Sequence, residues 1–192
     1  ALKELALGGG NRKLQDFSDE GEFDRAVFIH CEPRIVDQNQ TRARDIRISG
    51  FRQSLMKTHN VQELLAGRLS QRHYGKMIRS VFDIGMPNLI YVEGSSSMFS
   101  SFSRRYSELK SIFKHAKLRQ IPVVYYLPDA HEYWDDYVIS TRSATKVHFA
   151  RYLKKRLLRL LADNGCTIAY PSSEFKQALM LKLDSSLVSQ LE

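Results

Sequence analysis

Apolar segments of strand length recur along this chain, and segments with helical spacing separate them. The four clearest are rich in β-branched or aromatic residues: residues 26–31 (AVFIHC), 88–93 (NLIYVE), 121–127 (IPVVYYL) and 166–170 (CTIAY). Continuous apolar strands of this kind are typical of a parallel sheet that helices cover on both faces. A weaker segment at 61–66 predicts one more strand. The chain is therefore predicted to be an α/β protein.

Helices are predicted between these strands from apolar residues three or four positions apart. The expected helices cover residues 43–55, 70–82, 106–116, 144–164 and 173–183. The first is predicted from the apolar residues Ala43, Ile46, Phe51 and Leu55. Strands that alternate with helices predict a Rossmann-like parallel sheet with right-handed crossovers. Such sheets bind ligands beyond the carboxyl ends of their strands, so the loops that follow the strands are the candidate site.

Length and composition are those of one soluble domain. The chain has 192 residues, of which 43% are hydrophobic and 26% charged. Its two cysteines form no C-x-x-C pair, which argues against a disulfide framework or a structural zinc site. No apolar segment approaches the roughly 18 residues of a spanning helix, and the N-terminus lacks a signal-peptide pattern, so we expect a cytoplasmic protein. Residues 1–24 are expected to form a poorly ordered lead-in, and 25–192 a single domain.

The charge of the chain favours anionic partners. The formal net charge is +8, and residues 142–159 hold seven basic residues and no acidic one. A basic stripe opposite a leucine stripe fits an anionic membrane surface or nucleic-acid phosphate, with a merely solvated face as the alternative. The residues expected to make this contact are Lys154, Lys155, Arg156 and Arg159.

The loop at residues 32–42 offers groups that bind a phosphate or a carboxylate. It precedes a predicted helix, so its backbone amides can receive an anion, and Arg34 and Arg42 can pair with one. The patterns G-x-G-x-x-G and G-x-x-x-x-G-K-[ST] are absent, which argues against NAD binding and P-loop chemistry. The alternative is structural, with Asp37 and Asn39 in turns and Thr41 as a helix cap.

The loop at residues 93–97 (EGSSS) offers the Glu93 carboxylate and hydroxyls such as that of Ser95. These groups suit sugar hydroxyls, which both donate and accept hydrogen bonds. No G-x-S-x-G pattern is present, which argues against a hydrolase that would use a serine here together with His131. The loop is equally compatible with a serine-rich turn that has no function.

The loop at residues 129–134 (DAHEYW) holds the densest group of chemically useful side chains. His131 stands between carboxylates and can act as an acid, a base or a hydrogen-bond donor, while Tyr133 and Trp134 can stack on a sugar. The spacing offers no third and fourth metal ligand, so no metal is expected. A structural role for this histidine is the alternative.

Taken in order, these segments resemble the N-terminal domain of GT-B glycosyltransferases of the retaining, glycogen-synthase-like superfamily. The resemblance covers about residues 25–183 and rests on residues 27–34, 37–42, 88–93, 121–131 and 169–175. Gln38 and Asn39 stand where the family usually has a Gly-Gly pair, and residues 70–83 match no family motif. In this family the domain binds the acceptor, and a second domain, absent from this chain, binds the nucleotide sugar.

The resemblance also implies roles for individual residues. His131 would approach the transferred sugar with Asp129 orienting it, and the amides of Asn39 and Gln40 would meet the donor diphosphate. The acceptor would contact Arg34, Arg42, Glu93, Ser95, Tyr133 and Trp134.

The resemblance implies no cofactor and no metal beyond the nucleotide-sugar substrate. The acceptor would be a glycan or a lipid-linked molecule, with an anionic membrane surface at the inner face as a further partner. The chain alone would be inactive. The alternative is a non-catalytic Rossmann-like module that binds nucleic acid or phosphorylated ligands, although nucleic acid is the less expected partner.

Overall fold

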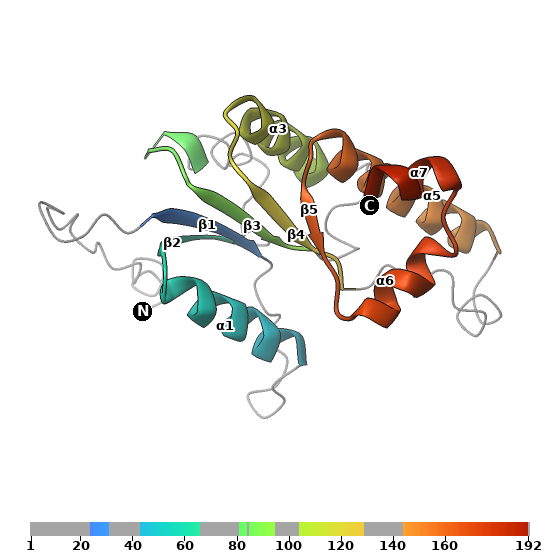
Figure 1. The fold of residues 1–192 in the computed structure, drawn as a ribbon, viewed down its shortest axis with the longest axis horizontal. Helices are drawn as coiled ribbons and strands as arrows, with labels where there is room; N and C mark the ends of the chain where they lie inside the picture. The colour runs from blue at the N-terminus through green and yellow to red at the C-terminus, as the bar shows by residue number, and fades with distance from the viewer. Residues whose placement is uncertain are drawn as a thin grey trace, which may run out of the picture.

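The protein forms one five-stranded sheet in which every strand pair is parallel (Figure 1). The computed structural model describes residues 24–30, 43–65, 81–83, 85–94, 104–128 and 144–191. The strands are β1 (Arg25–His30), β2 (Asn60–Leu65), β3 (Leu89–Glu93), β4 (Val123–Tyr126) and β5 (Thr167–Ala169). The prediction of an α/β, Rossmann-like parallel sheet is confirmed, including the weak strand that became β2.

The strand order β2-β1-β3-β4-β5 contains a reversal. The chain passes from β1 outward to β2 and then returns to β3 on the other side of β1. Parallel sheets with such a reversal bind ligands outside the carboxyl ends of the two strands between which the order changes. In this sheet those strands are β1 and β3.

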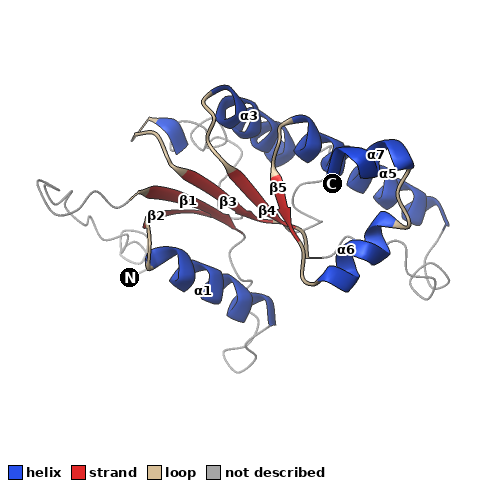
Figure 2. Ribbon diagram, viewed as in Figure 1, coloured by secondary structure: helices blue, strands red, loops and turns tan. Residues whose placement is uncertain are grey.

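Helices cover both faces of the sheet (Figure 2). The helices are α1 (Ala43–Met56), α3 (Arg104–Leu118), α5 (Ala144–Asp163), α6 (Ser173–Met180) and α7 (Ser185–Leu191). The main core joins α3, α5 and α7 to the sheet, and a smaller core lies under α1. The predicted helix at 70–82 falls largely outside the described residues, and so does the predicted lead-in at 1–24, of which only Asp24 is described.

Alternation along β1 assigns its side chains to the two cores. Val27 and Ile29 enter the main core, whereas Phe28 packs in the smaller core beneath α1. Successive side chains of a strand point to opposite faces of the sheet, so a continuous apolar strand fills both cores. Each fully buried side chain of this size contributes about 1.5 to 3 kcal/mol relative to exposure. This explains why β1 lacks polar alternation.

Two details of the predicted helices are wrong. Ile46 is 61% exposed, and Ile48 is the residue of α1 that enters the core. Five residues turn a helix by about 500°, so Ile46 and Phe51 lie about 140° apart, whereas Ile48, Phe51 and Leu55 follow one face. The helix predicted at 173–183 is shorter than expected, because α6 ends at Met180, and a further helix that was not predicted, α7, begins at Ser185. Ser172 caps the start of α6, because its Oγ accepts a hydrogen bond from the Phe175 backbone N–H at 3.1 Å.

Glu108 is a buried carboxyl group on α3. Within the described part of the chain its Oε2 atom has no hydrogen-bond partner. Burial raises the pKa of Glu108 to about 7, because removal from water disfavours the charged form. The folded state therefore holds this proton to a higher pH than the unfolded state.

The wild type is expected to lose stability as the pH rises from 4.5 to 7, and Glu108→Gln is expected to abolish this loss. Below that range both states are protonated, and above it the folded chain carries the full cost of a buried carboxylate. At about pH 8 the variant should gain about 3 kcal/mol in free energy of unfolding. Urea unfolding at both ends of the range measures this. Glu174→Gln, at an exposed site on α6, is the control, and equal pH dependence of wild type and Glu108→Gln would contradict the prediction.

Candidate functional site

Two strands that flank the reversal in strand order end in buried charged or polar residues. His30 is the last residue of β1, and Glu93, only 2% exposed, is the last residue of β3. The two strands are paired with Ile29 opposite Val92, so His30 and Glu93 each lie one residue beyond this pair. Both follow Phe28 and Tyr91 by two positions, which places them on the face covered by α1. The carboxyl edge therefore brings together an imidazole and a carboxylate.

An arginine of α1 holds Glu93. Arg47 donates from Nε and Nη2 to Glu93 Oε1, at 3.0 and 2.7 Å. The Arg47 guanidinium also lies 5.0 Å from the ring centroid of Tyr126, the last residue of β4. A carboxylate is costly to bury unless a charged donor accompanies it, so this contact makes the burial of Glu93 tolerable. It also connects the first half of α1 to β3 and β4.

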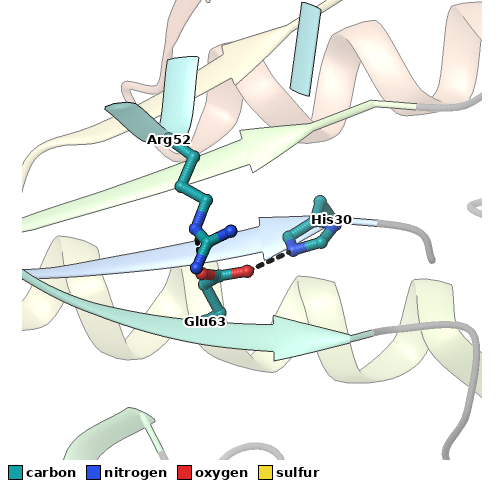
Figure 3. A network of polar contacts seen from close by, with 3 residues as sticks. All are labelled: His30, Arg52 and Glu63. Atoms are coloured by element: carbon teal, nitrogen blue, oxygen red, sulfur yellow. Dashed lines mark hydrogen bonds and ion pairs between the residues drawn. The ribbon is translucent and has the colours of Figure 1, made fainter. Parts of the chain in front are cut away.

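A second charge network connects β1, β2 and α1 (Figure 3). Glu63 of β2 accepts from His30 Nε2 at 3.1 Å through Oε2 and from Arg52 Nε at 2.5 Å through Oε1. Figure 3 shows the Glu63 carboxylate between the two partners. Because an ionised carboxylate only accepts hydrogen bonds, the contact assigns the proton of a neutral His30 ring to Nε2. Glu63 thereby sets both the tautomer and the orientation of the imidazole.

Aromatic rings fill the space beneath these charges. Tyr91 lies 5.4 Å from Phe28 and 5.2 Å from Phe51, measured between ring centroids, and Phe51 lies 5.3 Å from Tyr126. The Tyr91 hydroxyl is buried and has no hydrogen-bond partner among the described residues. Burial, with a further contribution from the Glu93 carboxylate, raises the pKa of Tyr91 well above its ordinary value. Tyr91 is therefore a neutral phenol beside the charged groups.

Gly94 brings the backbone of β3 close to β4 at this edge. Its N–H donates to the Tyr126 carbonyl oxygen at 2.9 Å. A Cβ at this position would lie 2.5 Å from the same oxygen and 2.6 Å from Tyr125 Cζ. Only glycine fits here without displacement of β4, so the close approach of the two strands depends on the residue that follows Glu93.

Most of the predicted site residues lie outside the described residues. This applies to Arg34, Asn39, Gln40, Arg42, Ser95, Asp129, His131, Tyr133 and Trp134. Glu93 is described and lies at the expected edge of the sheet, where Arg47 donates hydrogen bonds to its carboxylate. Within the described ranges no group of three or more His, Cys, Asp or Glu residues could hold a metal ion.

The basic residues of α5 do not share one exposed face. Lys154 is only 4% exposed and lies within the buried side of the helix, where Val147, Leu158 and Leu161 also lie. The expectation that Lys154 faces an anionic surface is therefore corrected. Lys155 contacts the Asp184 carboxylate at 3.1 Å, whereas Arg156 and Arg159 are exposed as expected.

Sequence reasoning did not identify four residues of the two networks as site residues: His30, Arg47, Arg52 and Glu63. It also missed Tyr91, which lies beneath them. A usable signal was present for His30, because it is a polar residue near the end of an otherwise apolar segment, as Glu93 is. No such signal marks Arg47 or Arg52, because arginines on a helix are usually solvated. Their role depends on the packing of α1 over the strands.

No protein-family model, curated protein or solved structure matches this chain.

Proposed function

We propose that this chain is the acceptor-binding domain of a glycosyltransferase that transfers a sugar from a nucleotide sugar without a metal ion. The observation that carries the proposal is the pair of buried polar residues, His30 and Glu93, at the reversal in strand order. A carboxylate held by an arginine, next to an oriented imidazole, offers the acceptors and donors that sugar hydroxyls require. The order of sequence motifs, which resembles that of GT-B enzymes, supports the same assignment.

The charge networks also support a role for the loop at residues 31–42. This loop starts after His30, which Glu63 orients, and ends at α1, which Arg47 and Arg52 connect to the sheet. The described residues on either side of this segment are thus attached to buried parts of the fold. A segment that precedes a helix can present backbone amides to a diphosphate. In our proposal Asn39 and Gln40 supply these amides, and Arg34 and Arg42 contact the acceptor.

In the proposed reaction the bond between the sugar's anomeric carbon and the diphosphate oxygen breaks, a bond to the acceptor oxygen forms, and the proton of the acceptor hydroxyl passes to the departing diphosphate. Amide donors and basic groups stabilise the charge that develops on the departing nucleoside diphosphate. His131 with Asp129 would act near the anomeric carbon, while Glu93, Ser95, Tyr133 and Trp134 would hold the acceptor. The chain requires a donor-binding domain for turnover, and we place the enzyme in the cytoplasm.

Saccharide binding by this chain alone tests the proposal. The purified chain is expected to bind neutral oligosaccharides, observed by saturation-transfer NMR, and to release no nucleoside diphosphate from UDP-, GDP- or ADP-sugars. Glu93→Gln should weaken saccharide binding about 10-fold, which is the scale of one charge-assisted hydrogen bond. Glu174→Gln, which removes an exposed carboxylate on α6, is the matched control and should bind like wild type.

Two outcomes would contradict the proposal. Release of nucleoside diphosphate by the chain alone would exclude a division into acceptor and donor domains. Binding of mononucleotides or oligonucleotides in place of saccharides would favour a non-catalytic module for phosphorylated ligands or nucleic acid.

A further inference from the structure

Two helices on the same side of the sheet expose a surface that is both basic and apolar. α3 and α5 bury Leu109, Phe113, Leu158 and Leu161 in the main core, so their opposite sides face away from the sheet (Figure 1). Two hydrogen bonds connect the helices: the Tyr106 hydroxyl donates to the Arg156 carbonyl at 3.5 Å, and Lys117 Nζ donates to the Asp163 carbonyl. The two helices are therefore neighbours, and we call their exposed sides together the α3–α5 outer surface.

Basic residues dominate the charge of this surface. Among the described side chains of residues 104–119 and 144–163, one exposed carboxylate, that of Asp163, stands against six exposed cations. The cations are Lys110, Lys114, Lys117, Arg119, Arg156 and Arg159. Four of the six come from α3 or the turn after it, a region that the charge pattern of α5 did not indicate. Two helices, and not α5 alone, thus supply the exposed cations.

Exposed apolar side chains lie on the same two helices. Leu118 at the end of α3 is 70% exposed, and Phe149 and Tyr152 on α5 are about half exposed. The Arg156 guanidinium lies 5.9 Å from the Tyr152 ring centroid, so a cation and an aromatic ring adjoin on this surface. Single exposed apolar residues are ordinary, but here three of them accompany an excess of positive charge. Hydration of the ammonium group accounts for an exposed lysine, whereas exposure of a leucine or phenylalanine side chain to water is unfavourable.

We propose that the α3–α5 outer surface binds an anionic lipid membrane. Its cations would attract anionic headgroups, while Leu118, Phe149 and Tyr152 would enter the boundary between headgroups and acyl chains. A nucleic-acid phosphate backbone would bind the cations but would make no favourable contact with an exposed aliphatic side chain such as Leu118. Across the described ranges no helix has the length and apolar character needed to cross a bilayer, so the proposed contact is peripheral. The inference does not depend on sugar transfer.

Sedimentation with vesicles tests the charged part of this surface. The chain should bind vesicles that contain phosphatidylglycerol and ignore pure phosphatidylcholine, and about 1 M salt should weaken the binding because it shortens the Debye length to about 3 Å. The double variant Lys110→Gln, Lys114→Gln should lower the partition coefficient about 30-fold, from the usual contribution of two cations near an anionic membrane. The matched control is Lys57→Gln, Lys182→Gln, which removes the same charge from exposed sites outside the surface.

A second pair of variants tests the apolar part. Leu118→Ser should lower the partition coefficient about 10-fold, because a leucine side chain is no longer transferred from water. Leu181→Ser is its control, since Leu181 is 84% exposed but follows α6 outside the α3–α5 outer surface. All these sites are exposed, so circular dichroism should show the wild-type fold in every variant.

The measurements separate membrane binding through the α3–α5 outer surface from binding that depends only on the net charge or overall hydrophobicity of the chain. Loss of binding in the surface variants but not in the controls supports the proposal. Equal losses in surface and control variants would overturn it, because net charge or overall hydrophobicity would then explain the binding. Failure to bind phosphatidylglycerol vesicles would overturn it as well, including the case in which the chain binds single-stranded or duplex nucleic acid instead.

Discussion

Arg47→Ala is expected to lower the free energy of unfolding by about 3 kcal/mol. The substitution removes the donor of the 2.7 and 3.0 Å contacts and leaves the carboxylate of Glu93 buried at the end of β3. A buried charge that loses its charged partner costs far more than the partner contributes at an exposed site. For a chain of this size the melting temperature should fall by about 6 to 12 °C. Differential scanning fluorimetry and urea titration measure the two quantities.

A double-mutant cycle separates this charge effect from the loss of packing by the arginine stem. Arg47→Ala combined with Glu93→Gln should be more stable than Arg47→Ala alone, because the neutral amide costs less to bury than the carboxylate. Arg52→Ala is a useful comparison, since that arginine is about half exposed and contacts the less buried Glu63. Its effect should stay near 1 kcal/mol. If both arginine variants lose the same stability, the proposal that Arg47 compensates the buried charge of Glu93 is wrong.

His131→Ala is expected to lower kcat about 10²-fold or more in the enzyme formed with a donor-binding domain. This is the scale on which a positioned acid, base or hydrogen-bond donor acts in the transition state. KM for the acceptor should change less, because Glu93 and the aromatic residues of the same loop are proposed to hold that substrate. Steady-state release of nucleoside diphosphate measures both constants.

His148→Ala is the matched control for this prediction, because His148 is exposed on α5 and has no proposed role in sugar transfer. Its kcat should equal that of the wild type. The thermal stability of His131→Ala should also remain close to wild type. Wild-type turnover in the His131 variant would return this residue to a structural role.

The reversal in strand order shows why local patterns could not locate the whole candidate site. Apolar segments predicted the strands, and Glu93 was expected at a strand end because its own segment ended there. The order β2-β1-β3 depends on long-range pairing, which no local pattern records. This order places His30 beside Glu93 and identifies that edge as the ligand-binding position. The nine predicted loop residues outside the described ranges remain predictions.

The basic helix α5 was likewise predicted from local sequence only in part. The lack of acidic residues at 142–159 indicated a basic helix, but it gave no sign that Lys154 lies on the buried side. Helical rotation decides this, because position 154 follows Val147 by seven residues and precedes Leu158 by four, which places all three on one side. A residue scale that counts lysine as polar assigns it to the exposed side. The length of the lysine stem allows burial when a partner is available.

The sequence by itself determined that this is an α/β protein with a parallel sheet, because strand and helix periodicities are local properties of side-chain order. It also determined the excess of positive charge. Only the tertiary structure decided that Arg47 and Arg52 bind carboxylates of different strands, and that a hydrogen bond connects α3 to α5. Each of these contacts joins residues at least 11 positions apart in the chain. They exist because packing of helices on the sheet brings distant segments together, and no periodicity within a segment specifies its partner.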